Sequence, residues 1–368
     1  MKQIFTLFLA LLFSVNIYAK SSNAEPTPSK ARFWTWVNYS DKRDWDAYFK
    51  ELKSVGMEGI LISSGVDGLN HVIPIAQKYG IEVQAWLWVM NNGGLANRHP
   101  EWLDYNALGH SLKDSMAYVG YYKFLNPIIP EVRREIASYF ENIAKVEGLS
   151  GVSLDYCRYV DAILPKGLWG SYGIVQDKIY PEWDYGYHPD MVNAFIQEYG
   201  YDPRAKLDTT PGAASIDDQK WLDFRCDVLN SLVDSIATLV HAQGKLLTAS
   251  PFPTPEMSKE MVRQDWGKWP LDMAFAMIYH GFYDGDDLEF VSQCVEECRR
   301  DMNPEGEIFL GMHIPDFRNP EGPTLTQTVK AGLDSGAKGF AMYTFDALTP
   351  QQKQELKAVI KEAKKRLK

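Results

Sequence analysis

The chain has 368 residues, a formal net charge of −10 and four Cys. An acidic chain whose Lys and Arg cluster only near the C-terminus lacks the basic patches that bind nucleic acid. Four Cys are also too few for a fold held together by disulfides, so we expect buried or free thiols. The 11 Trp and 20 Tyr are the unusual part of the composition.

Residues 1–24 predict a signal peptide, because a Lys near the start precedes a short apolar core and small residues that fit cleavage at Ala19 or Ala24. The apolar core is too short to span a bilayer as a stable helix. We therefore expect an exported protein of the bacterial periplasm or the extracellular space, without membrane insertion after cleavage. Residues 25–30 are predicted to form a tether, and residues 31–368 a single domain.

After the tether, short apolar runs rich in strand-forming residues alternate with amphipathic segments, and the alternation occurs eight times. The runs are FWTWVN (33–38), EGILISS (58–64), EVQAWLWV (82–89), SGVSLDY (150–156), KLLTASPF (245–252), DMAFAMIYH (272–280), IFLGMHI (308–314) and GFAMYTF (339–345). A parallel strand covered on both faces gives such a continuous apolar run and needs a crossover helix to the next strand.

Eight such repeats predict an α/β fold, a (β/α)8 barrel. A doubly wound open sheet is the alternative, but it favours a Gly-rich phosphate turn after its first strand, where this chain has VNYSD. Long insertions are expected after strands three and four, over residues 91–128 and 160–190. Both follow strands, so both belong to the C-terminal face, where barrel enzymes have their active sites.

The polar and aromatic residues near the strand ends are expected to meet at one mouth. Ser63 and Ser64 follow the second predicted strand, and Asn92 follows the third. The residues expected to bind substrate are Arg158, Asn38, Trp36, Trp88, Asn91, Tyr279, His280, His313 and Trp183. This set lacks HxH or HExxH spacing, so we predict no metal and no cofactor.

A mouth lined by carboxylates, amides and aromatic rings suits a neutral sugar, whose hydroxyls pair with polar groups while its ring lies on Trp or Tyr. The second insertion carries an aromatic cluster that would form a binding wall, or would only pack the long loop. Its members are Trp169, Tyr172, Tyr180, Trp183, Tyr185 and Tyr187.

Cleavage of a glycosidic bond needs two carboxyl groups. Asp155 is the first candidate, because in GVSLD it shares its parity with Ser153 and is opposite to Val152 and Leu154. Asp155 would then face the lumen, and Arg158 three residues later would hold it ionised as nucleophile or base. The second carboxyl, the acid, stays open: Asp346, Asp316 and Asp284 are the first choices, and Asp286 and Asp265 are further candidates.

At GVSLDYCRY the sequence resembles the glycosyl-hydrolase-like family 10 barrels, a bacterial group distinct from the true family 10 xylanases. The resemblance continues with Ser250, Pro251 and Phe252 and with the last strand, GAKGFAMYTF, and covers most of the mature chain. It implies a (β/α)8 glycosidase that acts on polysaccharide, with Asp155 as the catalytic residue.

The sequence therefore predicts an exported glycoside hydrolase with a carbohydrate substrate. Two alternatives remain: a non-catalytic carbohydrate-binding barrel, which needs no second carboxylate, and a metal-dependent hydrolase, which needs at least three converging ligands.

Overall fold

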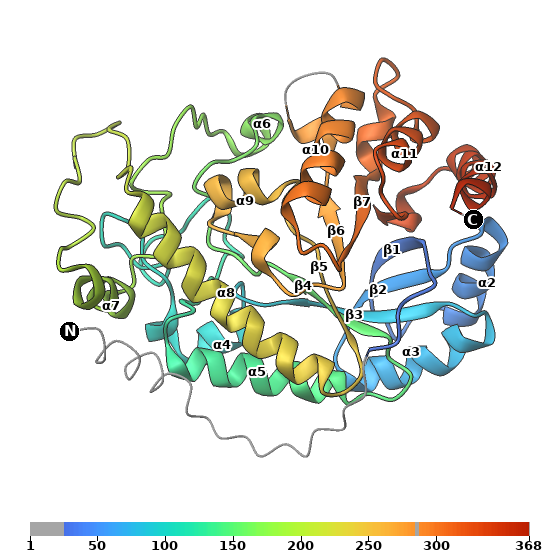
Figure 1. Ribbon diagram of the computed structural model, residues 1–368, viewed down its shortest axis with the longest axis horizontal. Helices are drawn as coiled ribbons and strands as arrows, with labels where there is room; N and C mark the ends of the chain where they lie inside the picture. The colour runs from blue at the N-terminus through green and yellow to red at the C-terminus, as the bar shows by residue number, and fades with distance from the viewer. Residues whose placement is uncertain (1–25, 284–286, 368) are drawn as a thin grey trace.

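The protein forms a closed barrel of eight parallel strands, as predicted (Figure 1). The structure, a computed structural model, describes residues 26–283 and 287–367; the predicted signal peptide and Asp284 lie outside these residues. The strands run in the order of the sequence, and β8 pairs with β1 to close the sheet. They are β1 (Phe33–Asn38), β2 (Gly59–Ser63), β3 (Glu82–Trp88), β4 (Gly151–Asp155), β5 (Leu246–Ala249), β6 (Met273–Met277), β7 (Glu307–His313) and β8 (Phe340–Tyr343).

Helices surround the barrel, and the first and last of the ring, α2 and α12, lie side by side where the barrel closes (Figure 1). The described helices are α2 (Trp45–Val55), α3 (Val66–Lys78), α4 (Gly93–Arg98), α5 (Pro130–Ala144), α6 (Trp169–Tyr172), α7 (Pro189–Tyr199), α8 (Gln219–His241), α9 (Pro255–Val262), α10 (Asp287–Asp301), α11 (Leu325–Asp334) and α12 (Pro350–Arg366). Short 3-10 turns η1 to η6 occur at Pro100–Trp102, Lys166–Leu168, Trp266–Lys268, His280–Phe282, Ile314–Arg318 and Phe345–Ala347.

Local sequence signals explain where helices begin and end. The Asp44 side chain accepts a hydrogen bond from the N–H of Ala47 at the start of α2, and Gly56 ends that helix with a φ of 109°, which favours glycine. Helix α12 begins with a capping box between Thr349 and Gln352. These caps satisfy backbone groups that a helix end leaves without partners.

The alternation along each strand divides the core into two layers. Val152 and Leu154 of β4 belong to the layer between strands and helices, while the barrel interior is filled by Trp34, Trp36, Trp86, Leu61, Phe275 and Phe309. A Cβ on Gly59 would lie 2.2 Å from the Trp34 ring, so only glycine fits beneath it. The barrel is therefore a packed core, and Trp36 and Trp86 lie nearest its C-terminal mouth.

Two long insertions stand at the carboxyl ends of neighbouring strands, as predicted. One joins β3 to α5 and contains α4, and the other joins β4 to α7 and contains α6. The two insertions are linked by an antiparallel bridge between Asn106 and Tyr185. Helix α8 lies against α5 beneath them (Figure 1). The insertions thus extend one sector of the mouth.

Candidate active site

Asp155 ends β4 and faces the barrel lumen, as its parity predicts. Trp86, a member of the interior cluster, donates from Nε1 to Oδ2 of Asp155 at 2.8 Å. The backbone N–H of Tyr156 donates to Oδ1 at 2.7 Å. Tyr156 adopts a φ of 48°, a conformation that costs a bulky residue roughly 1–3 kcal/mol and recurs at functional sites. The turn after β4 therefore directs a backbone donor at the carboxylate.

The Asp155 carboxyl is only 8% exposed. Burial raises its pKa to about 6, against the opposing effects of the Tyr156 N–H, the Trp86 N–H and the Arg158 charge. A pKa near the working pH is what general acid–base chemistry requires, because the group then changes its protonation state easily. Asp155 is thus poised for proton transfer rather than fixed in one state.

Arg158 does not contact Asp155, contrary to the sequence prediction. Its guanidinium lies 3.4 Å from Oδ2 of Asp161 and donates to the carbonyl of Tyr159 at 2.8 Å. The aromatic rings of Tyr122, Phe124, Tyr156 and Phe252 surround it. Because the backbone reverses at Tyr156, Arg158 is directed into the packed base of the insertion. It acts on Asp155 only through its charge.

A second carboxylate, Asp316, lies on the other side of the mouth in the turn after β7. Its Oδ1 lies 2.7 Å from Nδ1 of His313, and its Oδ2 accepts from the N–H of Gly281 at 3.2 Å. The His313 ring centre is 5.4 Å from that of Tyr279. Of the three first choices for the acid, Asp316 therefore has the most enclosed position among those described.

Tyr279 follows β6, and the charges of both carboxylates act on it. Burial raises the pKa of its hydroxyl well above the usual value, and the negative charges of Asp155 and Asp316 raise it further, together with Tyr343. Both carboxylates are thus close enough to Tyr279 to act on it. Asp155, Asp316, His313 and Tyr279 form one constellation at the carboxyl ends of β4, β6 and β7.

The other two first choices for the acid do not join this constellation. Asp346 makes two hydrogen bonds to Arg43, at 2.7 and 3.2 Å, in the connection between β1 and α2, and its side chain is 45% exposed. Asp346 follows the end of β8, but its turn directs the side chain outward to Arg43. It therefore does not lie in the mouth. Asp284 lies outside the described residues.

Three residues predicted to bind substrate have other positions. His280 is 4% exposed in the turn after β6, with Nδ1 3.3 Å from Asp287, and neither ring nitrogen makes a hydrogen bond among the described residues. Trp36 is 1% exposed and donates to Oγ of Ser250, so it forms the floor of the mouth. Trp183 is half-buried and its ring stacks on Tyr118 at 4.5 Å.

The aromatic cluster of the second insertion ranges from buried to exposed. Tyr185 and Tyr187 are 1% and 2% exposed. Tyr172 is 37% exposed. Among the cluster predicted as a wall, only Tyr172 ranks with the exposed large side chains of the described residues. Burial therefore removes Tyr185 and Tyr187 from a binding wall, and the wall stays a prediction for the other four.

The exposed aromatic rings of the mouth come from β3, the first insertion and β8. Trp88 is 42% exposed, Tyr121 50% and Tyr343 37%. The Trp88 ring lies 4.5 Å from that of Tyr156 and 6.1 Å from that of Tyr121, and the hydroxyls of Tyr121 and Tyr156 are 3.3 Å apart. These rings provide an apolar platform beside Asp155, the kind of surface on which a sugar ring lies.

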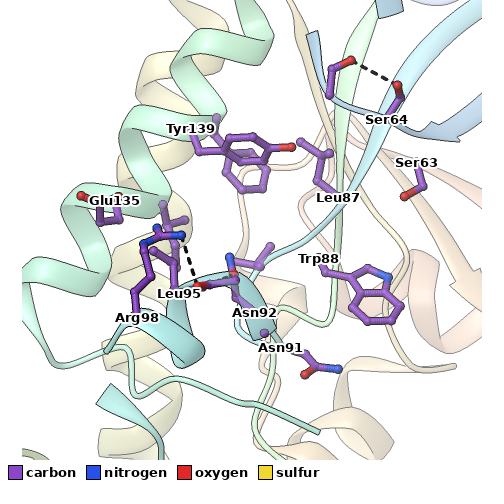
Figure 2. Close-up of a pocket in the computed structure, with 16 residues that line it drawn as sticks. Ser63, Ser64, Leu87, Trp88, Asn91, Asn92, Leu95, Arg98, Glu135 and Tyr139 are labelled. Atoms are coloured by element: carbon purple, nitrogen blue, oxygen red, sulfur yellow. Dashed lines mark hydrogen bonds between the residues drawn. The ribbon is translucent and has the colours of Figure 1, made fainter. Parts of the chain in front are cut away.

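A pocket of about 510 Å³ opens beside Trp88, between the ends of β2 and β3 and helix α5 (Figure 2). Asn91, predicted to bind substrate, lines it, while Asn38 is exposed at the end of β1 and pairs in register with Ser63 of the pocket. Asp155 does not line the pocket. Asp155 and this pocket are therefore neighbours, because Trp88 lines the pocket and pairs in register with Asp155.

Sequence reasoning missed Trp86, Tyr156 and Tyr343. The alternation in EVQAWLWV places Trp86 on the same side as Trp88, and this signal was sufficient to find it. The position of Tyr156 depends on its left-handed backbone conformation, which the sequence pattern does not reveal. Tyr343 ends β8, with its ring 6.2 Å from that of Trp86.

No group of three potential metal ligands occurs among the described residues. The four Cys are buried and free, as predicted. Within residues 26–283 and 287–367, no helix is long and apolar enough to cross a membrane.

No protein-family model matches the chain, so its resemblance to the glycosyl-hydrolase-like family 10 barrels stays a prediction, and no curated protein sequence matches it. Solved structures share its fold. The chain is similar to the PgaB (BpsB) glycoside hydrolase domain from Bordetella bronchiseptica, at 14% identity and a TM-score of 0.62, over 90% of this chain and 99% of that one.

Two further similar structures are the catalytic domain of a β-amylase from Paenibacillus polymyxa and Gan42B, a GH42 β-galactosidase from G. stearothermophilus. The β-amylase match has 14% identity and a TM-score of 0.59, and covers 92% of this chain and all of that one. The β-galactosidase match has 12% identity and a TM-score of 0.61, and covers 94% of this chain but 58% of that one. Such distant likeness establishes a shared barrel fold.

Proposed function

We propose that this protein is a glycoside hydrolase that cleaves an oligo- or polysaccharide at the mouth of the barrel. The observation that carries the proposal is Asp155: a buried carboxyl with a pKa of about 6, at the end of β4, next in register to the exposed ring of Trp88. The names of the similar structures, a glycoside hydrolase domain, a β-amylase and a β-galactosidase, support the same reaction class.

The proposed roles follow from the surroundings of Asp155 and of the Asp316–His313 pair. Asp155 is ionised above pH 6 and acts as nucleophile or base, held by the N–H groups of Trp86 and Tyr156. Asp316 and His313 supply the proton to the leaving oxygen. Because Asp316 holds Nδ1 of His313, Nε2 is the ring nitrogen left for a substrate. Trp88 and Tyr121 carry the sugar rings.

Hydrolysis is tested with purified protein and maltohexaose, cellohexaose, xylohexaose, mannohexaose, galactohexaose and chitohexaose, with products separated by chromatography. We expect wild type to cleave at least one of them, and Asp155→Asn to bind it without cleaving it. Wild-type binding without cleavage would favour a carbohydrate-binding barrel instead, since the aromatic platform serves both functions. Cleavage by Asp155→Asn at the wild-type rate would refute the assigned role of Asp155.

Export is proposed on the sequence of residues 1–24 alone. Expression of the full chain in a bacterium is expected to yield a periplasmic or secreted protein whose N-terminus follows Ala19 or Ala24. An intact N-terminus on a cytoplasmic product would contradict this proposal.

A further inference from the structure

The pocket beside Trp88 is lined by residues from the ends of two strands and from two helices, and many of them are polar. The ends of β2 and β3 form one side, helix α5 forms the other, and α4 closes the base (Figure 2). Its polar lining comprises Ser63, Ser64, Asn91, Asn92, Arg98 and Glu135. Its volume of about 510 Å³ falls within the range of small-molecule sites.

The pocket is one strand away from Asp155. Trp88 pairs in register with Asp155, and the N–H of Val89, a lining residue, donates to the Asp155 carbonyl at 2.8 Å. Trp88 is exposed to the mouth and also lines the pocket. A chain of sugar rings lying on Trp88 would therefore reach both places.

Asn91 belongs to the pocket wall, and its amide is held inside the protein. The residue is 2% exposed, and its Oδ1 accepts from the N–H of Lys123 at 2.8 Å. Its Nδ2 has no hydrogen-bond partner among the described residues. Because Nδ2 has almost no exposed surface, Asn91 shapes this wall of the pocket rather than contacting a ligand.

The charges of the pocket favour a neutral ligand. Arg98 and Glu135 bring one positive and one negative side chain to the same wall (Figure 2). Arg98 donates to the carbonyl of Gly94 at 3.2 Å, which uses one of its five N–H donors. Tyr139, 44% exposed, adds an aromatic ring from α5. Amides, hydroxyls, a guanidinium and an aromatic ring together suit a neutral sugar unit.

We propose that this pocket is a second carbohydrate site, which binds a distal unit of the same glycan that the mouth holds. The inference rests on the proposed function, because it names the length of substrate that the active site prefers. Binding energy from a unit far from the bond that breaks raises the rate for long chains, whereas short chains fail to reach it.

Gly93 gives the sharpest test. It lines the pocket, has no positive φ, and a Cβ built on it meets no atom within 4 Å. Gly93→Trp is therefore expected to fill the pocket without a clash in the fold. The matched control is Gly170→Trp in α6, where a Cβ also has open space outside the pocket. Arg98→Ala is the second variant, because Arg98 is exposed and its loss leaves the core intact.

The measured quantity is the ratio of kcat/KM for the cleaved hexasaccharide to kcat/KM for the trisaccharide of the same series. We expect a ratio of about ten or more in wild type and Gly170→Trp, equivalent to about 1.4 kcal/mol of distal binding. Gly93→Trp should bring the ratio near one, and Arg98→Ala should lower it in part. An unchanged ratio in Gly93→Trp would overturn the proposal.

The experiment distinguishes a protein that does not hydrolyse glycans from a pocket that does not bind them. If wild type cleaves no member of the hexasaccharide panel, binding of the same probes is measured by calorimetry. A hexasaccharide that binds wild type and Gly170→Trp but binds Gly93→Trp about tenfold more weakly would support the pocket without hydrolysis. Absence of binding by every probe, or equal binding by all variants, would overturn it.

Discussion

Two buried aspartates of this protein, Asp155 and Asp184, have opposite surroundings. Asp155 receives hydrogen bonds from two neutral N–H groups, and burial raises its pKa to about 6. Asp184 is fully buried in the second insertion, where Arg225 and Arg263 lie 2.8 and 2.9 Å from its Oδ1. Burial raises the pKa of Asp184, but the two guanidinium charges outweigh it and hold that pKa well below the usual range.

The difference separates a buried carboxyl that suits proton transfer from one that is held as an ion. Asp184 connects the insertion to α8 through Arg225 and to the turn after α9 through Arg263, so it is locked in its charged form as a structural link. Asp155 has no cation at contact distance among the described residues, so its proton is exchangeable near neutral pH. Both residues are buried, and the number of contacting cations decides whether burial raises or fails to raise the pKa.

The largest expected effect comes from Asp155→Asn. Loss of the carboxylate is expected to lower kcat by about 1,000-fold or more, because a positioned acid or base contributes roughly 100- to 10,000-fold. The free energy of unfolding at pH 8 should stay at or above the wild-type value, since an amide is cheaper to bury than this charge. Initial rates on the cleaved hexasaccharide measure the loss of kcat, and urea unfolding measures the change in stability.

Asp346→Asn is the matched control for this prediction. Its carboxylate also follows a strand end, but it pairs with Arg43 outside the constellation. We expect kcat within about twofold of wild type, since surface substitutions away from special features have small effects. Equal losses in the two variants would remove the distinction between them.

Asp184→Asn is expected to act on stability instead. The substitution leaves two buried guanidinium groups without their shared anion, and removal of one partner of a buried ion pair costs about 3–5 kcal/mol. Urea unfolding measures the loss. The control is Asp202→Asn, whose partner Arg204 is exposed, with an expected loss under about 1 kcal/mol. A stable Asp184→Asn variant with a dead active site would reverse the assignment.

The two aspartates should also give opposite pH dependences of stability. Asp155 has a folded pKa raised above the unfolded value of about 3.9, so its contribution is fully present below pH 4 and lost as pH rises through about 6. Asp184 has a lowered pKa, so its contribution is present above pH 4 and lost as pH falls. For Asp155 the change amounts to about 3 kcal/mol at most.

This prediction is checked by urea unfolding of wild type and Asp155→Asn between pH 4 and 8. The difference in free energy of unfolding, variant minus wild type, should grow in favour of the variant up to pH 7 and then level. A difference that is constant with pH would mean that the Asp155 carboxyl has an ordinary pKa in the folded protein.

The sequence predicted the barrel because each strand is covered on both faces and leaves a continuous apolar run. FWTWVN matches β1 residue for residue, and the other runs differ from their strands by a few residues at the ends. The lumen-facing parity of Asp155 followed from the same alternation, which is a property of any strand.

The missed features depend on contacts between distant segments or on backbone turns. The three-residue spacing suggested that Arg158 pairs with Asp155, but Tyr156 reverses the backbone and Asp161 receives the guanidinium. Strand-end position did not reveal that Asp346 turns outward to Arg43, which is distant in sequence. The pocket needs Glu135 and Tyr139 from a later helix, and no local pattern predicts that meeting.

The smallest expected effect is a shift in pH profile, from Trp86→Phe. Trp86 donates to Oδ2 of Asp155 and lowers its pKa, so removal of this donor should raise the pKa further. A hydrogen bond to a charged group contributes about 1.5–3 kcal/mol, which corresponds to a shift of about one unit or more. The acidic limb of the kcat/KM profile should move to higher pH by that amount. At pH 8, kcat/KM itself should fall only modestly.

Trp34→Phe distinguishes this effect from a mere change in packing. Trp34 also fills the barrel interior, but its Nε1 donates to the carbonyl of Ala31, away from Asp155. This variant should lose stability through the same change of ring, while its acidic limb stays at the wild-type pH. If both variants shift the limb equally, packing of the interior rather than the Trp86 hydrogen bond sets the pKa of Asp155, and the contrast with Asp184 rests on burial alone.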